Sequence, residues 1–95
     1  MMSIFSTEEF DAWFSDLRDK QAQKRIQVRI DRAEEGNFGD CQPVGEGVSE
    51  MRIHYGAGYR VYFVQRGIDI VILLAGGDKS TQQKDIKMAL KLARE

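Results

Sequence analysis

Apolar residues recur with helical spacing in three stretches of the chain. The segment STEEFDAWFSDLRD, residues 6–19, places its large apolar side chains three or four residues apart, after a Ser6–Glu9 pair that has the form of a capping box. A second stretch runs from about Lys20 to Glu34, and a third follows a Ser80–Gln83 pair near the C-terminus. These patterns predict three amphipathic helices, whose apolar faces carry Phe10, Trp13, Phe14 and Leu17, then Ala22, Ile26, Ile30 and Ala33, then Ile86, Ala89, Leu90 and Ala93.

The region between the second and third helical stretches has the pattern of β-structure. Strands are predicted at about 48–55, 59–66 and 68–75, with tight turns at Tyr55-Gly56-Ala57-Gly58-Tyr59 and at Arg66-Gly67. The residues MSIF near the N-terminus could add a short strand, and EGNFGDCQPVGEG, with four glycines and the single proline, is typical of a loop. Successive strands joined by tight turns predict an antiparallel sheet covered by helices. We therefore expect one α+β domain over residues 1–95.

Alternation along the first two of these strands assigns their side chains to opposite faces. Met51, Ile53, Val61 and Phe63 point one way, which we expect to be toward the helices. The opposite face carries polar groups of an unusual kind, and we expect it to be open: Arg52, His54, Arg60 and Tyr62. The third strand is apolar on both sides, so it should be central or covered by the last helix.

Composition narrows the class of protein. A single cysteine among 95 residues allows no internal disulfide and fits a reducing cytoplasm. The acidic N-terminus does not have the form of a signal peptide, and the longest apolar run, Ile70–Ala75, is too short to span a membrane. With one Cys and one His, no metal site is expected, and no cofactor motif is present. These features predict a cytoplasmic protein without a metal or cofactor.

The formal net charge of -1 conceals a segregation of charge along the chain. Residues 1–16 hold four acids and no base, whereas residues 18–32 hold six bases. Residues 34–50 then hold five acids and no base, and residues 51–66 hold three arginines and the histidine without an acid. A net charge near zero argues against long-range steering to nucleic acid, but it allows a local basic face.

Several sequence blocks resemble the RelE/ParE superfamily of addiction-module toxins, close to the HigB-like branch. They are Gly-Asn-x-Gly-Asp, Gly-x-Gly-Val-x-Glu-x-Arg-Ile, Gly-Tyr-Arg-Val-Tyr-Phe and Gly-Gly-Asp-Lys-Ser-x-Gln, in that order across nearly the whole chain. The resemblance implies a small antiparallel sheet with two N-terminal helices on one face and a C-terminal helix. It also implies a type II toxin encoded beside a helix-turn-helix antitoxin that binds it. Relatives of the RelE type cleave mRNA on the ribosome, and relatives of the ParE type inhibit DNA gyrase.

Within this resemblance, the polar strand face becomes a candidate site for metal-independent RNA cleavage. Arg60 is the main candidate for a phosphate clamp, with Arg52 and Lys79 as further cations. His54 has the side chain best suited to carry the proton of the 2′-hydroxyl at neutral pH. For substrate contact we expect Tyr62, which could stack on a base or bond to phosphate, and Ser80.

Simpler interpretations of the same residues stay open. Arg52 could pair with Glu50 or Glu46, Lys79 and Ser80 could merely open the last helix, and the basic second helix could be a solvated face. The chain ends in KMALKLARE, without the Tyr or His that RelE-type enzymes carry near their C-terminus. The leading hypothesis is a ribosome-dependent mRNA endoribonuclease that inhibits translation. The alternatives are a ParE-like gyrase inhibitor and a non-toxic module that only binds its antitoxin.

Overall fold

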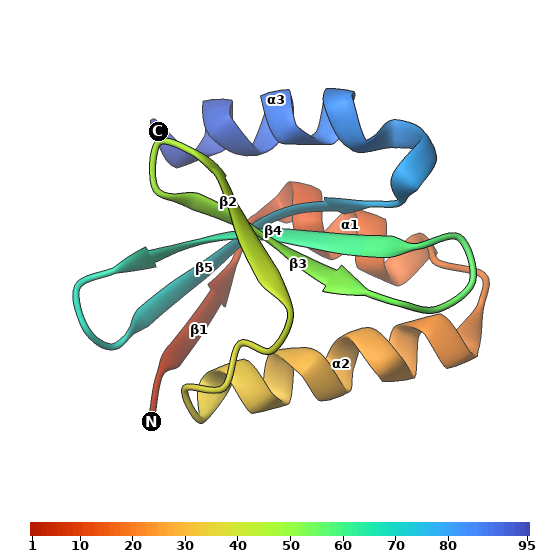
Figure 1. The fold of residues 1–95 in the computed structure, drawn as a ribbon, viewed down its shortest axis with the longest axis horizontal. Helices are drawn as coiled ribbons and strands as arrows, with labels where there is room; N and C mark the ends of the chain where they lie inside the picture. The colour runs from red at the N-terminus through yellow and green to blue at the C-terminus, as the bar shows by residue number, and fades with distance from the viewer.

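The computed structural model describes residues 1–95 as a five-stranded sheet with helices on both faces (Figure 1). The strand order is β1-β5-β4-β3-β2, antiparallel except for β1, which pairs with β5 in parallel. The expected α+β class and the short N-terminal strand are thus confirmed. The elements are β1 Ser3–Ser6, α1 Glu8–Asp16, α2 Lys20–Glu34, β2 Cys41–Gly45, β3 Val48–Ile53, β4 Tyr59–Arg66, β5 Ile70–Gly77, the 3-10 turn η1 Lys79–Thr81 and α3 Gln82–Ala93.

Helices α1 and α2 cover one face of the sheet, as predicted. Their apolar sides meet the inward residues of β3, β4 and β5 in the larger core cluster, which includes Phe10, Ile26, Ile30, Met51, Ile53, Val61 and Phe63. The helix starts differ from the expected capping boxes. Thr7, not Ser6, caps α1 by accepting a hydrogen bond from the Phe10 N–H at 3.0 Å, while the Ser6 hydroxyl donates to Asp11.

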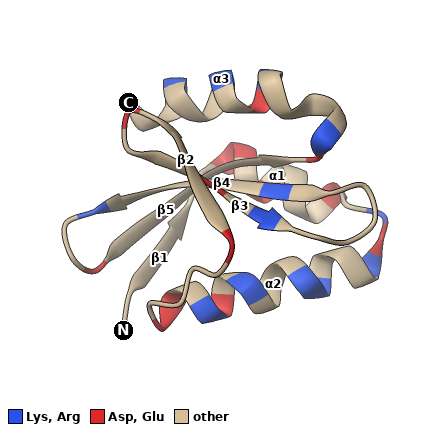
Figure 2. Cartoon of the chain, viewed as in Figure 1, with Lys and Arg blue, Asp and Glu red and all other residues tan.

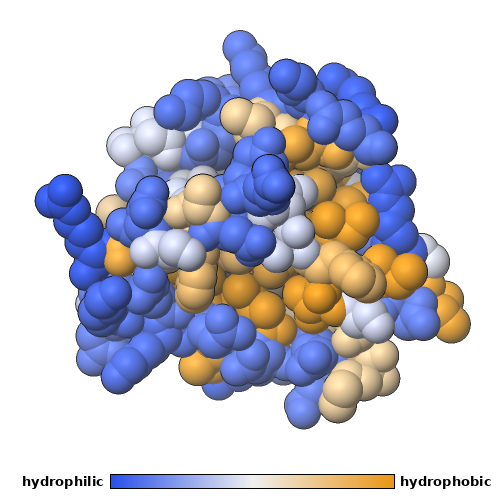
Figure 3. Space-filling view, turned by 180° about the vertical axis from the view of Figure 1, so that it is seen from behind, coloured by the Kyte–Doolittle hydropathy of each residue, from blue (hydrophilic) through white to orange (hydrophobic).

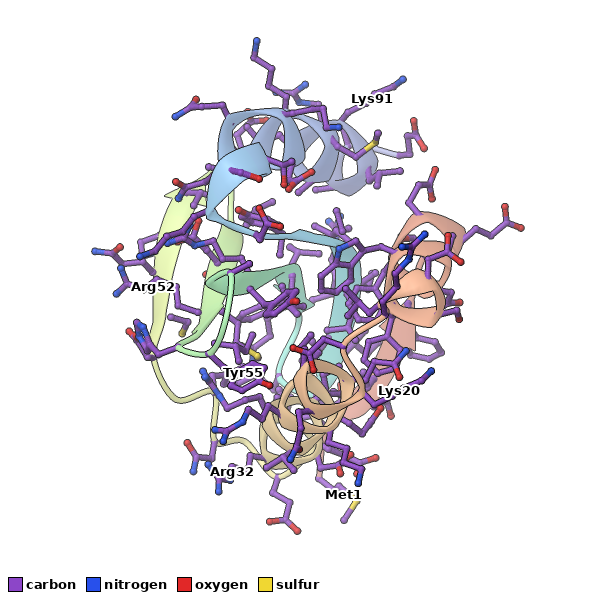
Figure 4. All side chains as sticks on the ribbon, turned by 90° about the vertical axis from the view of Figure 1, so that its right-hand side faces the viewer. Met1, Lys20, Arg32, Arg52, Tyr55 and Lys91 are labelled. Atoms are coloured by element: carbon purple, nitrogen blue, oxygen red, sulfur yellow. The ribbon has the colours of Figure 1, made fainter.

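Helix α3 covers the other face, and this overturns the expectation of an open polar face. The second core cluster lies beneath α3 and joins Val48, Tyr62, Val64, Leu74, Ala75 and Ala89. Tyr62 is completely buried there. The side view in Figure 4 places α3 on one side of the sheet and α1 and α2 on the other. The apolar residues Val48 and Val64 share this face with the arginines, and their burial requires a cover.

Strand β2 lies in the segment that we expected to be a loop, so that expectation was wrong. Cys41–Gly45 pairs with β3 as an edge strand, with an irregularity between Pro43 and Gly45. An edge position tolerates a proline because one side of the strand needs no ladder hydrogen bonds. The strand is mostly exposed and therefore lacks the apolar pattern that marks the others.

The passage from β5 into α3 is tight. A capping box joins Asp78 and Thr81 around η1, in place of the expected Ser80–Gln83 pair, and Thr81 makes no side-chain cap to α3 itself. A Cβ on Gly77 would lie 1.7 Å from the Asp85 carboxylate, so this position requires glycine. None of the helices has the length and apolar character needed to cross a membrane.

Candidate functional site

Two arginines lie side by side on neighbouring strands. Arg52 on β3 and Arg60 on β4 are direct cross-strand partners. Figure 2 shows a basic segment on each of these two strands. Like charges in this relation repel each other unless they are compensated. Each guanidinium has its own carboxylate: Asp40 lies 2.9 Å from Arg52 Nη2, and Glu50 lies 3.6 Å from Arg60 Nε. The expected pairing of Arg52 with Glu50 or Glu46 is therefore wrong, and Glu46 pairs with Arg94.

Glu50 is the buried carboxylate that lies beside Arg60. Its residue is only 3% exposed, and a buried carboxylate is stable only when it is paired and hydrogen-bonded. The Gln82 amide donates to it at 2.8 Å and the Tyr62 hydroxyl at 3.2 Å. Burial, followed by the charge of Glu50, raises the pKa of Tyr62 far above its usual range. Tyr62 is thus a neutral donor that supports the site from below, and a base could stack on its ring only if α3 moved.

The guanidiniums keep donors that no protein group uses. Arg60 Nε and Nη1 and Arg52 Nε are buried and have no hydrogen-bond partner, because 3.6 Å is too long for a bond from Arg60 Nε to Glu50. Buried polar groups of this kind are rare and costly in folded proteins. The Arg60 side chain is 12% exposed. The two guanidiniums are therefore held mainly by the charges of Glu50 and Asp40, and part of each is buried without a hydrogen-bond partner.

His54 follows the end of β3 and is joined to Arg52 through Asp40. Its Nε2 lies 2.5 Å from Asp40 Oδ2, while the other carboxylate oxygen of Asp40 bonds to Arg52. The His54 side chain is 74% exposed, so it is open to a substrate. The hydrogen bond with His54, and then the one with Arg52, lower the pKa of Asp40.

Lys79 reaches the same end of the sheet from η1. Its N–H donates to the Ala57 carbonyl, and its methylene stem packs on Gly58, where a Cβ would lie 2.9 Å from Lys79 Cγ. Ser80 is exposed, but its hydroxyl and its N–H both donate to Asp78. Lys79 therefore contacts the turn between β3 and β4, whereas the hydroxyl and N–H of Ser80 are both engaged by the capping residue Asp78.

A hollow of 490 Å³ lies beside His54, between the end of β3 and α2. Its walls are mainly basic and include Lys24, Arg25, Arg29 and Arg32. In Figure 4 the labelled Arg32 on α2 lies on the same side of the molecule as Arg52. Arg29 is tied to backbone carbonyls, with Nη1 2.6 Å from the Arg52 oxygen, and burial lowers its pKa. The basic surface of α2 therefore continues into the cationic end of the sheet.

The structure brings together most of the side chains that the sequence singled out. Arg52, Arg60, His54 and Lys79 gather at one end of β3 and β4, with Tyr62 beneath them. Sequence reasoning missed Asp40 and the amide of Gln82. It named Glu50 as a possible partner of Arg52, whereas the structure places Glu50 beside Arg60. No group of three or more His, Cys, Asp or Glu side chains is placed so that it could hold a metal ion.

This geometry defines a class of small α+β domains that have two N-terminal helices, a C-terminal helix and a cationic end of the sheet. The chain matches the family described as "Phage derived protein Gp49-like (DUF891)" over residues 12–95, and it belongs to that family. It is also 50% identical to an uncharacterized protein of Haemophilus influenzae over 94 residues, which cover 99% of this chain and 95% of the relative. This membership agrees with a toxin-like protein of the RelE/HigB type and leaves the particular activity open.

Proposed function

We propose that this protein is the toxin of a type II toxin–antitoxin module and cleaves mRNA on the ribosome. The observation that carries the proposal is the cross-strand pair Arg52 and Arg60, which lies next to the exposed side chains of His54 and Lys79. Membership of a toxin-like family supports it. Cations that are fixed before the substrate arrives stabilise developing charge without reorganisation during the reaction.

The proposed reaction uses the side chains of this end of the sheet and a proton from solvent. The 2′-oxygen of the RNA attacks the adjacent phosphorus, the bond to the 5′-oxygen breaks, and a 2′,3′-cyclic phosphate and a 5′-hydroxyl result. His54 accepts the proton of the 2′-hydroxyl, and the leaving oxygen takes a proton from solvent. Arg60 and Arg52 hold the non-bridging oxygens, for which a planar guanidinium fork is well suited. Lys79 adds charge from the turn side.

The decisive experiment is cleavage of mRNA on programmed ribosomes by the purified protein. Arg60→Lys keeps a charge beside Glu50 but loses the fork, so we expect cleavage at least about 10-fold slower, with normal folding. Arg66→Ala is the matched control, since Arg66 lies at the far end of the same strand. Full activity of Arg60→Lys and of Arg60→Ala would contradict this site. Failure to cleave, together with inhibition in a gyrase supercoiling assay, would favour the ParE-like alternative.

The partner of such a toxin would be an antitoxin from the adjacent gene, with a helix-turn-helix domain. Figure 3 shows apolar side chains gathered on the back of the molecule. Large apolar side chains that are exposed on the protein include Phe5, Ile68, Ile70 and Met88. A partner could bury such a surface with a hydrophobic segment and place acids near the basic end. Co-expression should give a stable complex and restore growth. Separate elution of the two proteins with persisting toxicity would contradict this.

A further inference from the structure

We propose that Asp40 is a positioning residue that orients His54 for proton transfer. This inference rests on the proposed ribonuclease function and adds a residue to it. Asp40 lies in the segment before β2, and its two carboxylate oxygens bond to different partners, His54 Nε2 at 2.5 Å and Arg52 Nη2 at 2.9 Å. The carboxylate therefore links the candidate proton acceptor to a candidate phosphate clamp.

The backbone around Asp40 is firmly anchored. Its carbonyl accepts hydrogen bonds from the Arg52 N–H at 3.0 Å and from Arg29 Nη2 at 3.2 Å. One residue earlier, Gly39 has a φ of +64° and packs on the Arg29 guanidinium, where a Cβ would lie 2.9 Å from Nη2. The preceding Phe38 ring stacks on Phe63, with centroids 5.2 Å apart. A carboxylate on such a fixed backbone can hold a ring more firmly than a flexible surface pair could.

The geometry assigns roles to the two ring nitrogens of His54. A nitrogen that faces a carboxylate carries the hydrogen, so Nε2 is the donor and Nδ1 is left as the acceptor. The ring is 74% exposed, and Nδ1 can therefore receive the 2′-hydroxyl proton from a bound substrate. The imidazolium that forms is then stabilised by the charge of Asp40. This is the role of a carboxylate that orients a histidine base.

The cations around His54 make the negative charge of Asp40 important for proton transfer. The hollow beside the ring is lined by the cations Lys24, Arg25, Arg29 and Arg32 of α2, and Arg52 lies on the strand that precedes His54. Cations repel the positive charge that forms on the ring when it accepts the substrate proton. Asp40 is the acid in contact with it, so the removal of its charge should slow proton transfer more than binding.

The test compares Asp40→Asn and Asp40→Ala with Glu46→Gln, an exposed acid paired with Arg94 elsewhere. Because His54 is the single histidine, its ring ¹⁵N shifts report the tautomer directly. We expect the neutral ring to carry its hydrogen on Nε2 in the parent, and Asp40→Ala to give a mixture of tautomers. In single-turnover cleavage, Asp40→Asn should be about 10-fold slower, which is less than the roughly 10²- to 10⁴-fold contribution of a general base because His54 itself is still present. We expect an altered pH profile and unchanged RNA affinity.

A double-mutant cycle separates this role from a merely structural one. If Asp40 acts through His54, the variant Asp40→Asn/His54→Ala should cleave no more slowly than His54→Ala alone. Cleavage by Asp40→Asn at or above the parental rate, while Arg60→Lys is impaired, would overturn this inference and leave the proposed function standing. An unchanged tautomer in Asp40→Ala would also overturn it. If the parent does not cleave RNA at all, the proposed function falls, and the catalytic role of Asp40 falls with it.

Discussion

The two cross-strand arginines differ in depth, and this difference decides what each contributes to stability. Arg60 is paired with the buried Glu50, whereas Arg52 is paired with Asp40, whose side chain is 41% exposed. Removing a partner from a buried charge leaves that charge without compensation, but an exposed carboxylate is simply hydrated again. Arg60 therefore holds the fold as well as the candidate site.

From this contrast we predict that Arg60→Ala destabilises the protein and that Arg52→Ala does not. Arg60→Ala should cost about 3 kcal/mol, the low end for a broken buried pair, whereas Arg52→Ala should cost less than about 1 kcal/mol. Urea denaturation of both variants gives the comparison. The double variant Arg60→Ala/Glu50→Ala should recover part of the loss. Equal stability of the two single variants would show that Glu50 does not depend on Arg60.

Asp40 also makes the stability of the protein depend on acid pH. Its hydrogen bonds lower the pKa of the folded carboxyl below the ordinary 3.8. As pH falls below about 4, the unfolded chain takes up this proton first, so the stabilisation is present above that pH and is lost as pH falls through the folded pKa. The pKa of Glu46 is lowered in the same direction by Arg94.

We therefore expect Asp40→Asn to lose less stability than the parent between pH 5 and pH 3. Denaturation midpoints at the two pH values measure this, and Glu46→Gln tests the second acid separately. A parent and an Asp40→Asn variant with identical acid losses would contradict the prediction.

At the scale of the elements, periodicity located the helices and the apolar strands. It did not show which face of the sheet each helix covers. The boundaries of α2 and β4 agree with the prediction, because α2 has one buried face of helical period and β4 is bounded by glycine turns, although its central residues are buried on both faces. Strand β2 was not predicted because an exposed edge strand with a proline has no buried apolar face. The position of α3 depends on the turn from Gly77 through η1, which no periodicity encodes. Val48 and Val64, on the same face as the arginines, were the available signal that this face is covered.

The cover by α3 can be tested at Ala89, which is fully buried against the sheet. Ala89→Glu places a charge in this dry contact, so we expect α3 to detach or the stability to fall by several kcal/mol. Lys87→Glu is the matched control, since Lys87 is exposed on the same helix. Dye binding to exposed apolar surface and urea denaturation report the difference. Similar behaviour of both variants would show that α3 is not needed as a cover.

The whole molecule combines a net charge of -1 with a basic surface at one side. The sequence predicted the cations of the candidate site, because alternation places Arg52 and Arg60 together. It could not predict that Asp40 bonds to Arg52 and His54, because this contact depends on the pairing of β2 with β3. Sequence reasoning named Glu50 as a possible partner of Arg52, whereas the folded strands place Glu50 beside Arg60. The hollow lined by α2 likewise requires the folded arrangement. Local charges, not the net charge, must then provide any attraction for RNA.

The last prediction follows from this local charge and rests on the proposed function. If RNA phosphates lie along the basic side of α2, the logarithm of the binding constant should fall linearly with the logarithm of salt concentration. Lys24→Gln and Arg32→Gln each remove one cation from the wall of the hollow. Each should weaken binding for all sequences alike and reduce the salt slope by about 0.7 to 0.9, the value for one phosphate contact. Lys87→Gln on α3 should leave the slope unchanged. Filter-binding or fluorescence titrations at several salt concentrations measure the slopes. If Lys24→Gln and Arg32→Gln have the same slope as the parent, the basic side of α2 is only a solvated face. RNA must then approach the arginines from η1, which carries Lys79.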